Sequence, residues 1–259
     1  MEQKCWEVAG KDQKVPAQRL IDFLDGKVSK DFPQTSYQPG LKSVDLNELL
    51  PPLISESLKQ ETLAHFKVKK DIQVVPNFIP TLEHLPKPDE TQRMQYARPE
   101  EPILCHISNF RKVKRVEDVI RIFEKVNQTI PAKLLMVGDG PDRFACEQLC
   151  RSLGLCDRII FLGKLRETRL VLELADVFLL PSESESFGLA ALEAMAVGVP
   201  VVSSDTGGLP EVNIHGVSGF LTAVGDVAGM ANYTLELLSP ERKLAYKQNA
   251  LKRAKAFSI

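Results

Sequence analysis

The sequence has almost no net charge and no long hydrophobic run. Its 259 residues carry 33 Lys and Arg against 34 Asp and Glu, a formal net charge of −1. This balance argues against binding nucleic acid or an anionic membrane through bulk electrostatics. No stretch approaches the ~18 apolar residues of a membrane span, and the opening MEQKCWEVAG lacks the apolar core of a signal peptide. We therefore expect a cytoplasmic protein with no membrane span and no nucleic-acid partner.

Several site signatures are also missing. The five cysteines lack paired C-x-x-C spacing and the four histidines are scattered, so neither a disulfide framework nor a metal site is expected. Ser182, Ser184 and Ser186 lie outside any G-x-S-x-G elbow, which disfavours a serine hydrolase. The Gly138-Asp139-Gly140 run has no third glycine and is a weak dinucleotide signal. His106 falls within a strand pattern and is expected to be a core residue.

Regular hydrophobic periodicity is missing before residue 100. Residues 1–53 are a poorly patterned leader or remnant, in which the spacing of Ala17, Leu20, Ile21 and Leu24 predicts a helix over residues 14–27. Six of the 17 prolines fall between residues 76 and 102, as is typical of a linker or an irregular crossing segment. At about 150 residues per domain, the length lies between one domain and two.

What the sequence does contain, from residue 103 onward, is a regular alternation of apolar runs and amphipathic segments. The predicted strands cover residues 103–108, 133–138, 159–163, 177–181, 199–204 and 219–223. Continuous apolar strands separated by helices indicate a parallel sheet with both faces covered. Residues 100–238 therefore predict an α/β, Rossmann-like domain. Residues 239–259 predict a closing helix.

The segment after the fourth strand holds two glutamates eight positions apart, Glu185 and Glu193. Gly188 opens a helix between them, and free N–H groups at a helix start bind anions. Carboxylates beside an anion site suggest a sugar nucleotide, because carboxylates accept hydrogen bonds from hydroxyls. A glycosidase pair fits less well, since eight helical residues span roughly 12 Å whereas hydrolytic carboxylates lie about 5–9.5 Å apart. A solvated acidic loop remains an alternative.

A short basic segment follows the first strand of this domain. Arg111, Lys112, Lys114 and Arg115 lie between the end of that strand and the next helix. Arg grips phosphate through two hydrogen bonds and Lys acts as a point charge, so the segment could neutralise a diphosphate leaving group. A solvated basic loop is the alternative. The segment is short and lacks interleaved aromatic residues, which disfavours a nucleic-acid patch.

Taken together, PSESESFGLAALEAMAVGVPVVSSDTGGLPEV, the upstream KRVEDVI and the strand-end VGDGP resemble the signature of retaining GT-B glycosyltransferases (family 4 type), which include sucrose and glycogen synthases. The resemblance implies a Rossmann-like parallel sheet flanked by helices, the C-terminal half of a GT-B fold. It also implies a UDP-sugar donor, with neither cofactor nor metal. LCHISNFRKVKRVEDVI and DIQVVPNFI resemble members that transfer N-acetylglucosamine to a small hydroxy acid, L-malate.

The resemblance also implies roles for individual residues. Glu193 would bind the ribose hydroxyls, and Glu185 would contact the sugar hydroxyls near the reacting carbon. Lys114 and Arg111 would hold the diphosphate and, with Glu185, form the catalytic set. Many relatives carry an arginine five positions before the lysine, where this chain has Asn109; Asn109 would then be a donor-binding residue, with Arg111 in place of the missing arginine.

Backbone groups would complete the donor site implied by the resemblance. The amides of Phe187, Gly188 and Leu189 would assist at sugar and phosphate. The backbone from Gly163 to Leu165 would border the uracil.

The sequence departs from this family before residue 100. The first domain of a GT-B enzyme carries a Gly-rich loop and a βαβ series, and neither is evident there. Residues 54–99 resemble only the end of that domain and its crossover linker, and the chain ends early in the last helix. Two hypotheses stay open, an active transferase and a truncated module that binds the UDP-sugar without transferring it. A sugar-nucleotide 2-epimerase is disfavoured by SFGLAALEAMA, and an exposed former interface would favour a homo-oligomer.

Overall fold

The computed structural model describes residues 15–17, 22–23, 26–30, 41–43, 46 and 90–257. The chain divides into two compact units, Met1–Phe78 and Ile79–Ile259. In the first unit, strand β1 (Val15–Ala17) pairs in parallel with strand β2 (Leu41–Ser43). Hydrophobic patterning did not indicate this parallel pair.

The helix predicted over residues 14–27 is wrong at its start, because Val15–Ala17 is a strand. The β-branched Val15 directly precedes Pro16, and the proline ring disfavours helical backbone at the residue before it. Asp22 and Phe23 are helical, and Phe23 is buried. Residues 18–21 and 24–25 lie outside the described part of the chain. The preference of Val15-Pro16 for extended backbone therefore outweighs the helical spacing of apolar residues at this point.

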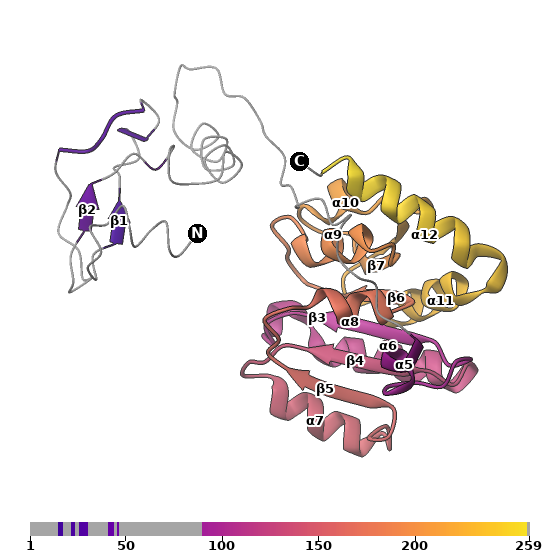
Figure 1. The fold of residues 1–259 in the computed structure, drawn as a ribbon. Coiled ribbons are helices and arrows are strands. Elements are labelled where there is room, and N and C mark those ends of the chain that lie inside the picture. The colour runs from indigo at the N-terminus through magenta and orange to yellow at the C-terminus, as the bar shows by residue number, and fades with distance from the viewer. Residues whose placement is uncertain are drawn as a thin grey trace. The chain divides into compact units, whose positions relative to one another are not determined.

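The second unit is built on a six-stranded parallel sheet, with strand order β5-β4-β3-β6-β7-β8 (Figure 1). The strands are β3 (Ile103–Ile107), β4 (Lys133–Val137), β5 (Ile159–Gly163), β6 (Val177–Leu180), β7 (Val201–Ser204) and β8 (Gly219–Thr222). Every strand predicted from residue 103 onward is present, most of them one or two residues shorter than expected. The predicted Rossmann-like architecture is confirmed.

Helices cover both faces of the sheet (Figure 1). The helical elements are α5 (Glu90–Met94), the 3-10 turn η1 (Lys112–Lys114), α6 (Val116–Thr129), α7 (Arg143–Ser152), α8 (Arg169–Leu174), α9 (Leu189–Ala196), α10 (Leu209–Val212), α11 (Val227–Leu238) and α12 (Pro240–Lys255). Helices α6, α7 and α11 pack on one face, and α8, α9 and α10 pack on the other. Helix α12 packs against α9 and α11.

The strands read as continuous apolar runs because each face of the sheet has its own core. On β3, Leu104 joins the core beneath α6, α7 and α11, whereas Ile103 and Cys105 join the core beneath α8 and α9. All three side chains are fully buried. The alternation of side chains along a strand thus distributes one hydrophobic run between two cores.

The Asp176 side chain connects helices α5 and α12 to the amino edge of the sheet. The Asp176 carboxylate, just before β6, accepts hydrogen bonds from the Ile103 amide at 2.8 Å and from Arg93 of α5 at 2.8 Å. Lys243 of α12 lies 2.7 Å from its other oxygen. Burial opposes ionisation of Asp176, but the two cations outweigh it and hold its pKa below the usual value. Helix α12 is therefore part of this unit.

The strand order places a topological switch point between β3 and β6. From β3 the chain moves outward to β4 and β5, and it then returns to the other side of β3 to form β6, β7 and β8. In open α/β sheets, ligands bind beyond the carboxyl ends of the strands at such a reversal. The loops after β3 and β6 are therefore where a ligand site is expected.

Candidate functional site

A buried histidine, His106 of β3, lies between β3 and β6 at the switch point. His106 has no exposed surface; its Nδ1 lies 2.8 Å from the Leu179 carbonyl oxygen of β6, and its Nε2 lies 2.7 Å from Ser108 Oγ. Since a carbonyl can only accept, Nδ1 donates and Nε2 accepts the hydrogen of the Ser108 hydroxyl. Burial lowers the pKa of His106 to about 4, so the ring is neutral. The predicted core histidine is confirmed, and it ties β3 to β6 beneath the site.

The loop after β3 is held in shape by backbone contacts. Its 3-10 turn is closed by the Lys114 amide donating to the Arg111 carbonyl at 2.8 Å. The Glu183 amide, in the loop after β6, donates to the Val113 carbonyl at 2.8 Å. The two loops at the switch point are therefore fastened to each other directly.

Glycines after β4 support the same loop from the other side. A Cβ on Gly138 would lie 1.8 Å from the Ser108 carbonyl oxygen, and one on Gly140 would lie 2.4 Å from the Phe110 carbonyl oxygen. Side chains cannot fit at either position, which explains the glycines of VGDGP without any role in binding a dinucleotide.

The central contact of the site joins the two sequence motifs. Lys114 Nζ donates a hydrogen bond to Glu185 Oε2 at 2.5 Å, across 71 positions of sequence. The two side chains are only 19% and 15% exposed, so this ion pair is largely shielded from water. The Ser182 hydroxyl, fully buried, donates to the same carboxylate oxygen at 3.3 Å. One carboxylate oxygen is thus fixed by a cation and a hydroxyl.

Helix α9 begins beside this pair. Gly188, its N-cap, has φ +93°, a backbone conformation that favours glycine. A Cβ there would also lie 2.6 Å from Leu209 Cδ2. The first helical residue, Leu189, is 48% exposed. The helix start that the sequence predicted as an anion site therefore follows Glu185 closely, with a buried N-cap at Gly188 and an exposed first residue at Leu189.

The loop after β7 shapes the backbone of Glu185. A Cβ on Gly207, where φ is +54°, would lie 1.9 Å from the Glu185 carbonyl oxygen, and one on Gly208 would lie 2.5 Å from the Ser186 carbonyl oxygen. The Gly208 amide donates to the Glu185 carbonyl at 2.9 Å. We did not predict this support or the Ser182 contact from the sequence. The adjacent glycines between β7 and α10 were the signal for the first.

Glu193 lies one turn into α9, partly buried. Burial raises the pKa of its carboxyl, and the nearby charge of Glu167 raises it further. Glu167 belongs to the loop after β5, the loop that contains Leu165, which is 38% exposed. At the end of β5, Gly163 has φ +69°. The charge of Glu167, on the loop that the resemblance assigns to the uracil, therefore acts on Glu193.

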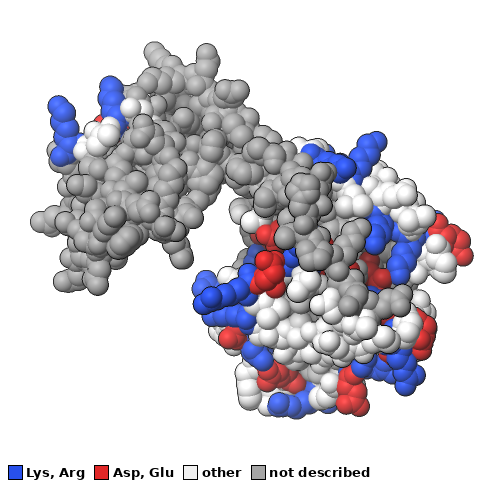
Figure 2. Space-filling view, viewed as in Figure 1, with Lys and Arg blue, Asp and Glu red and all other residues white. Residues whose placement is uncertain are grey.

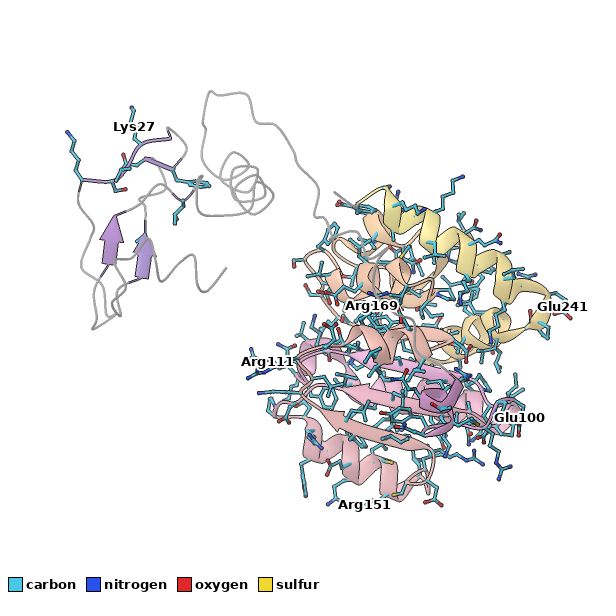
Figure 3. All side chains as sticks on the ribbon, in the orientation of Figure 1. Lys27, Glu100, Arg111, Arg151, Arg169 and Glu241 are labelled. Carbon is cyan, nitrogen blue, oxygen red and sulfur yellow. The ribbon has the colours of Figure 1, made fainter. Side chains whose placement is uncertain are left out.

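Three of the expected site residues are not part of the cluster formed by Lys114, Glu185 and Ser182. Asn109 and Arg111 are exposed, and the Arg111 side chain extends away from the ribbon (Figure 3). The Phe187 ring packs edge-on against Phe257 of the C-terminal segment, with ring centroids 5.9 Å apart. The cluster at the switch point consists instead of Lys114 and Glu185, with Ser182 behind them.

The visible surface of the second unit carries both signs of charge. Lys and Arg side chains alternate with Asp and Glu side chains, without a broad patch of one sign on this face (Figure 2). Within the described ranges, no three His, Cys, Asp or Glu side chains are grouped to hold a metal ion. No helix in the described part of the chain is long and apolar enough to cross a membrane.

The six-stranded parallel sheet with helices on both faces has the Rossmann-like fold of a GT-B glycosyltransferase domain. Residues 88–254 match the family model described as "Glycosyl transferases group 1". The chain belongs to this family.

Among curated relatives, the N-acetyl-alpha-D-glucosaminyl L-malate synthase of Bacillus anthracis is 48% identical over 190 residues, which cover 73% of this chain and 50% of that protein. The D-inositol 3-phosphate glycosyltransferase of Mycobacterium marinum is 35% identical over 152 residues, covering 54% of this chain and 32% of that protein. The chain therefore spans half or less of the length of these curated relatives.

Solved structures with the same fold include Anabaena HepE in complex with UDP-glucose. The TM-score is 0.67 at 25% identity, covering 78% of this chain and 58% of that chain. Sucrose-phosphate synthase from Thermosynechococcus elongatus gives a TM-score of 0.65 at 28% identity, covering 77% of this chain and 52% of that chain. The described unit is thus similar to part of each of these proteins.

Residues 1–76 match a second family model, described as "FAD-dependent protein, C-terminal domain-like". The match overlaps residues 1–53, predicted to be a leader or remnant, and residues 54–99, predicted to be the end of a first GT-B domain and its crossover linker. Both assignments remain predictions, as do the domain limits at 100–238 and 239–259.

Proposed function

We propose that this chain carries the donor-binding half of a retaining glycosyltransferase that uses UDP-N-acetylglucosamine. The observation that carries the proposal is the 2.5 Å contact between Lys114 and Glu185 at the switch point, where a cation for phosphate and a carboxylate for hydroxyls share one place. The low exposure of Lys114 and Glu185 would strengthen the attraction of Lys114 for phosphate and of Glu185 for hydroxyls, because charges are less screened away from water.

In this proposal the diphosphate is held on one side of the site. Lys114 releases Glu185 in part to contact the phosphates, and Arg111 turns in from solvent to add a second cation. The free amides at the start of α9, from Phe187 to Leu189, donate to sugar and phosphate oxygens. As the bond to the sugar breaks, negative charge grows on the diphosphate and these groups stabilise it. No metal ion is required for that role.

The remaining donor contacts follow from the positions of the carboxylates. Glu185 accepts hydrogen bonds from hydroxyls of the transferred sugar. Glu193 accepts them from the ribose, and these hydrogen bonds would offset the desolvation that raises the pKa of its carboxyl. The backbone from Gly163 to Leu165 borders the uracil. Retention would follow if the acceptor attacks the face from which the diphosphate leaves, through an oxocarbenium-like state.

We propose L-malate as the acceptor. The support is the name of the B. anthracis relative, which shares 48% identity over 73% of this chain. A second candidate is a module that binds the UDP-sugar without transferring it. Cytoplasmic location and self-association remain predictions.

Calorimetric titration with UDP-N-acetylglucosamine, repeated in the presence of L-malate, tests these proposals. We expect a Kd in the micromolar to millimolar range, roughly −8 to −4 kcal/mol. Absence of binding to both UDP and the UDP-sugar would refute either function. Release of UDP that depends on malate would favour the transferase, whereas binding without turnover would favour the binding module.

A further inference from the structure

An aromatic contact joins the end of helix α12 to the loop that carries Glu185. Phe257 follows the last residue of α12 by two positions, and its ring packs edge-on against the Phe187 ring, with centroids 5.9 Å apart and ring planes at 71°. Edge-to-face pairs attract each other beyond the apolar area that they bury. Phe187 directly precedes Gly188, the N-cap of α9. The end of α12 therefore contacts the segment that supplies the proposed donor amides.

Arg253, in the last turn of α12, holds the Phe257 ring. Its guanidinium carbon lies 4.7 Å from the ring centroid, within the range of a cation–π contact. The same guanidinium donates from Nε to the Val212 carbonyl at 3.1 Å and from a terminal nitrogen to the Glu211 carbonyl. These carbonyls end helix α10, where a cationic donor is favourable. Arg253 therefore connects the end of α12 to α10, which lies beside it (Figure 1).

Helix α10 in turn packs against the start of α9. A Cβ on Gly188 would lie 2.6 Å from Leu209 Cδ2, so the first side chain of α10 lies directly against the N-cap of α9. The Gly208 amide, just before α10, donates to the Glu185 carbonyl at 2.9 Å. The end of α12 thus reaches the donor loop directly, through Phe257, and also through α10.

We propose that Phe257 is a positioning residue for the donor site: its ring, held by Arg253, fixes Phe187 and with it the backbone at the start of α9. The inference rests on the proposed function, since the amides from Phe187 to Leu189 and the Glu185 carboxylate are the groups that receive the sugar and phosphates. Phe257 itself touches neither. A loop that is already fixed loses less conformational entropy when a ligand binds, and this raises the affinity.

Hydrogen exchange of the full chain without ligand tests the positioning. Two backbone hydrogen bonds report on the start of α9: the Leu192 amide donates to the Gly188 carbonyl at 3.1 Å, and the Gly208 amide donates to the Glu185 carbonyl at 2.9 Å. In Phe257→Ala both amides should exchange roughly 3- to 10-fold faster, the contribution of one aromatic pair. The amides of β3 and β4 should keep their rates, because only a local opening becomes easier.

Two further variants separate positioning from a general loss of stability. Leu244→Ala is the matched control, because Leu244 lies on the same helix, is 65% exposed and also loses an apolar side chain; the exchange of Leu192 and Gly208 should not change. Phe257→Tyr keeps the ring and should restore slow exchange. Unchanged rates in Phe257→Ala, or equal acceleration at α9 and in β3 and β4, would overturn the proposal.

Calorimetry with UDP-N-acetylglucosamine separates this inference from the proposed function. Phe257→Ala should raise the Kd by a similar factor, roughly 3- to 10-fold, and Phe257→Tyr should restore it. A wild-type chain that binds no UDP-sugar would refute the proposed function, and the exchange rates would still decide whether Phe257 positions the loop. Binding by the wild type with an equal Kd in Phe257→Ala would overturn the positioning role alone.

Discussion

Replacing Glu185 by Gln is expected to strengthen the binding of free UDP. In the structure Lys114 Nζ donates a hydrogen bond to Glu185 Oε2 at 2.5 Å. Lys114 is also the cation that we propose for the diphosphate. A nucleoside diphosphate must therefore share Lys114 with a negative charge that the protein itself supplies. The glutamine side chain has nearly the same shape and keeps a carbonyl oxygen for Lys114, but it removes this charge.

The size of the effect follows from Coulomb's law. A phosphate oxygen bonded to Lys114 Nζ would lie about 3 Å from it, on the side away from Glu185, and so within about 6 Å of the carboxylate oxygen. With an effective dielectric constant of roughly 20 to 80, the repulsion between two unit charges at that distance is about 1–3 kcal/mol. The Kd for UDP should therefore fall roughly 5- to 150-fold. The gain for UDP-N-acetylglucosamine should be smaller, because the sugar would lose a carboxylate acceptor.

Isothermal calorimetry with UDP at low and moderate salt measures this change. Glu183→Gln is the matched control, since Glu183 lies on the same loop, is exposed, and loses the same charge. Its effect on the Kd should be small, because exposed charges are screened. An unchanged or weaker affinity for UDP in Glu185→Gln would refute the competition for Lys114.

Three further predictions concern other parts of the unit. Glu193→Ala should weaken UDP binding by about 1–3 kcal/mol, because a half-buried acceptor for hydroxyls is lost; an unchanged Kd would exclude contact with the ribose. Gly207→Ala should lower the free energy of unfolding by at least about 1 kcal/mol more than Gly216→Ala, since both glycines have positive φ but only at Gly207 would the new Cβ meet backbone, the Glu185 carbonyl. Denaturant titration decides this, and equal losses would contradict it. His106 has a pKa of about 4 in the folded protein against 6.5 when unfolded, so the unfolded chain takes up the proton first as the pH falls. His106 should therefore not change the free energy of unfolding above pH 6.5, and should lower it by up to about 3 kcal/mol as the pH falls from 6.5 to 4. This contribution should be absent in His106→Gln. The same acid-induced loss in the Gln variant would disprove the assignment.

Sequence patterns predicted the second unit well because each of its elements is locally consistent. The strands of the sheet are short apolar runs, and the intervening helices repeat apolar residues at helical spacing. The prediction over residues 14–27 was wrong at Val15–Ala17, where apolar spacing was counted but the restriction imposed by Pro16 was not. In that region the periodic signal was too weak to decide between helix and strand.

The candidate site was predicted in its parts but not in its contacts. The loops that hold Lys114 and Glu185 could be placed after strand ends from sequence alone. The hydrogen bond from Ser182 and the close packing of Gly207 could not, because they depend on how separate loops fold over one another. Arg111, which the sequence grouped with Lys114, extends into solvent instead (Figure 3).

The sequence by itself determined which segments are buried strands, which are amphipathic helices and which loops carry charge. Those properties follow from the periodicity of apolar residues along each element, which is local information. Only the tertiary structure decided that β6 lies beside β3, through a crossover from β5 that passes over β4 and β3. That neighbour relation brings Lys114 and Glu185 within 2.5 Å of each other. It depends on how the helices pack on the two faces of the sheet, and no single segment encodes it.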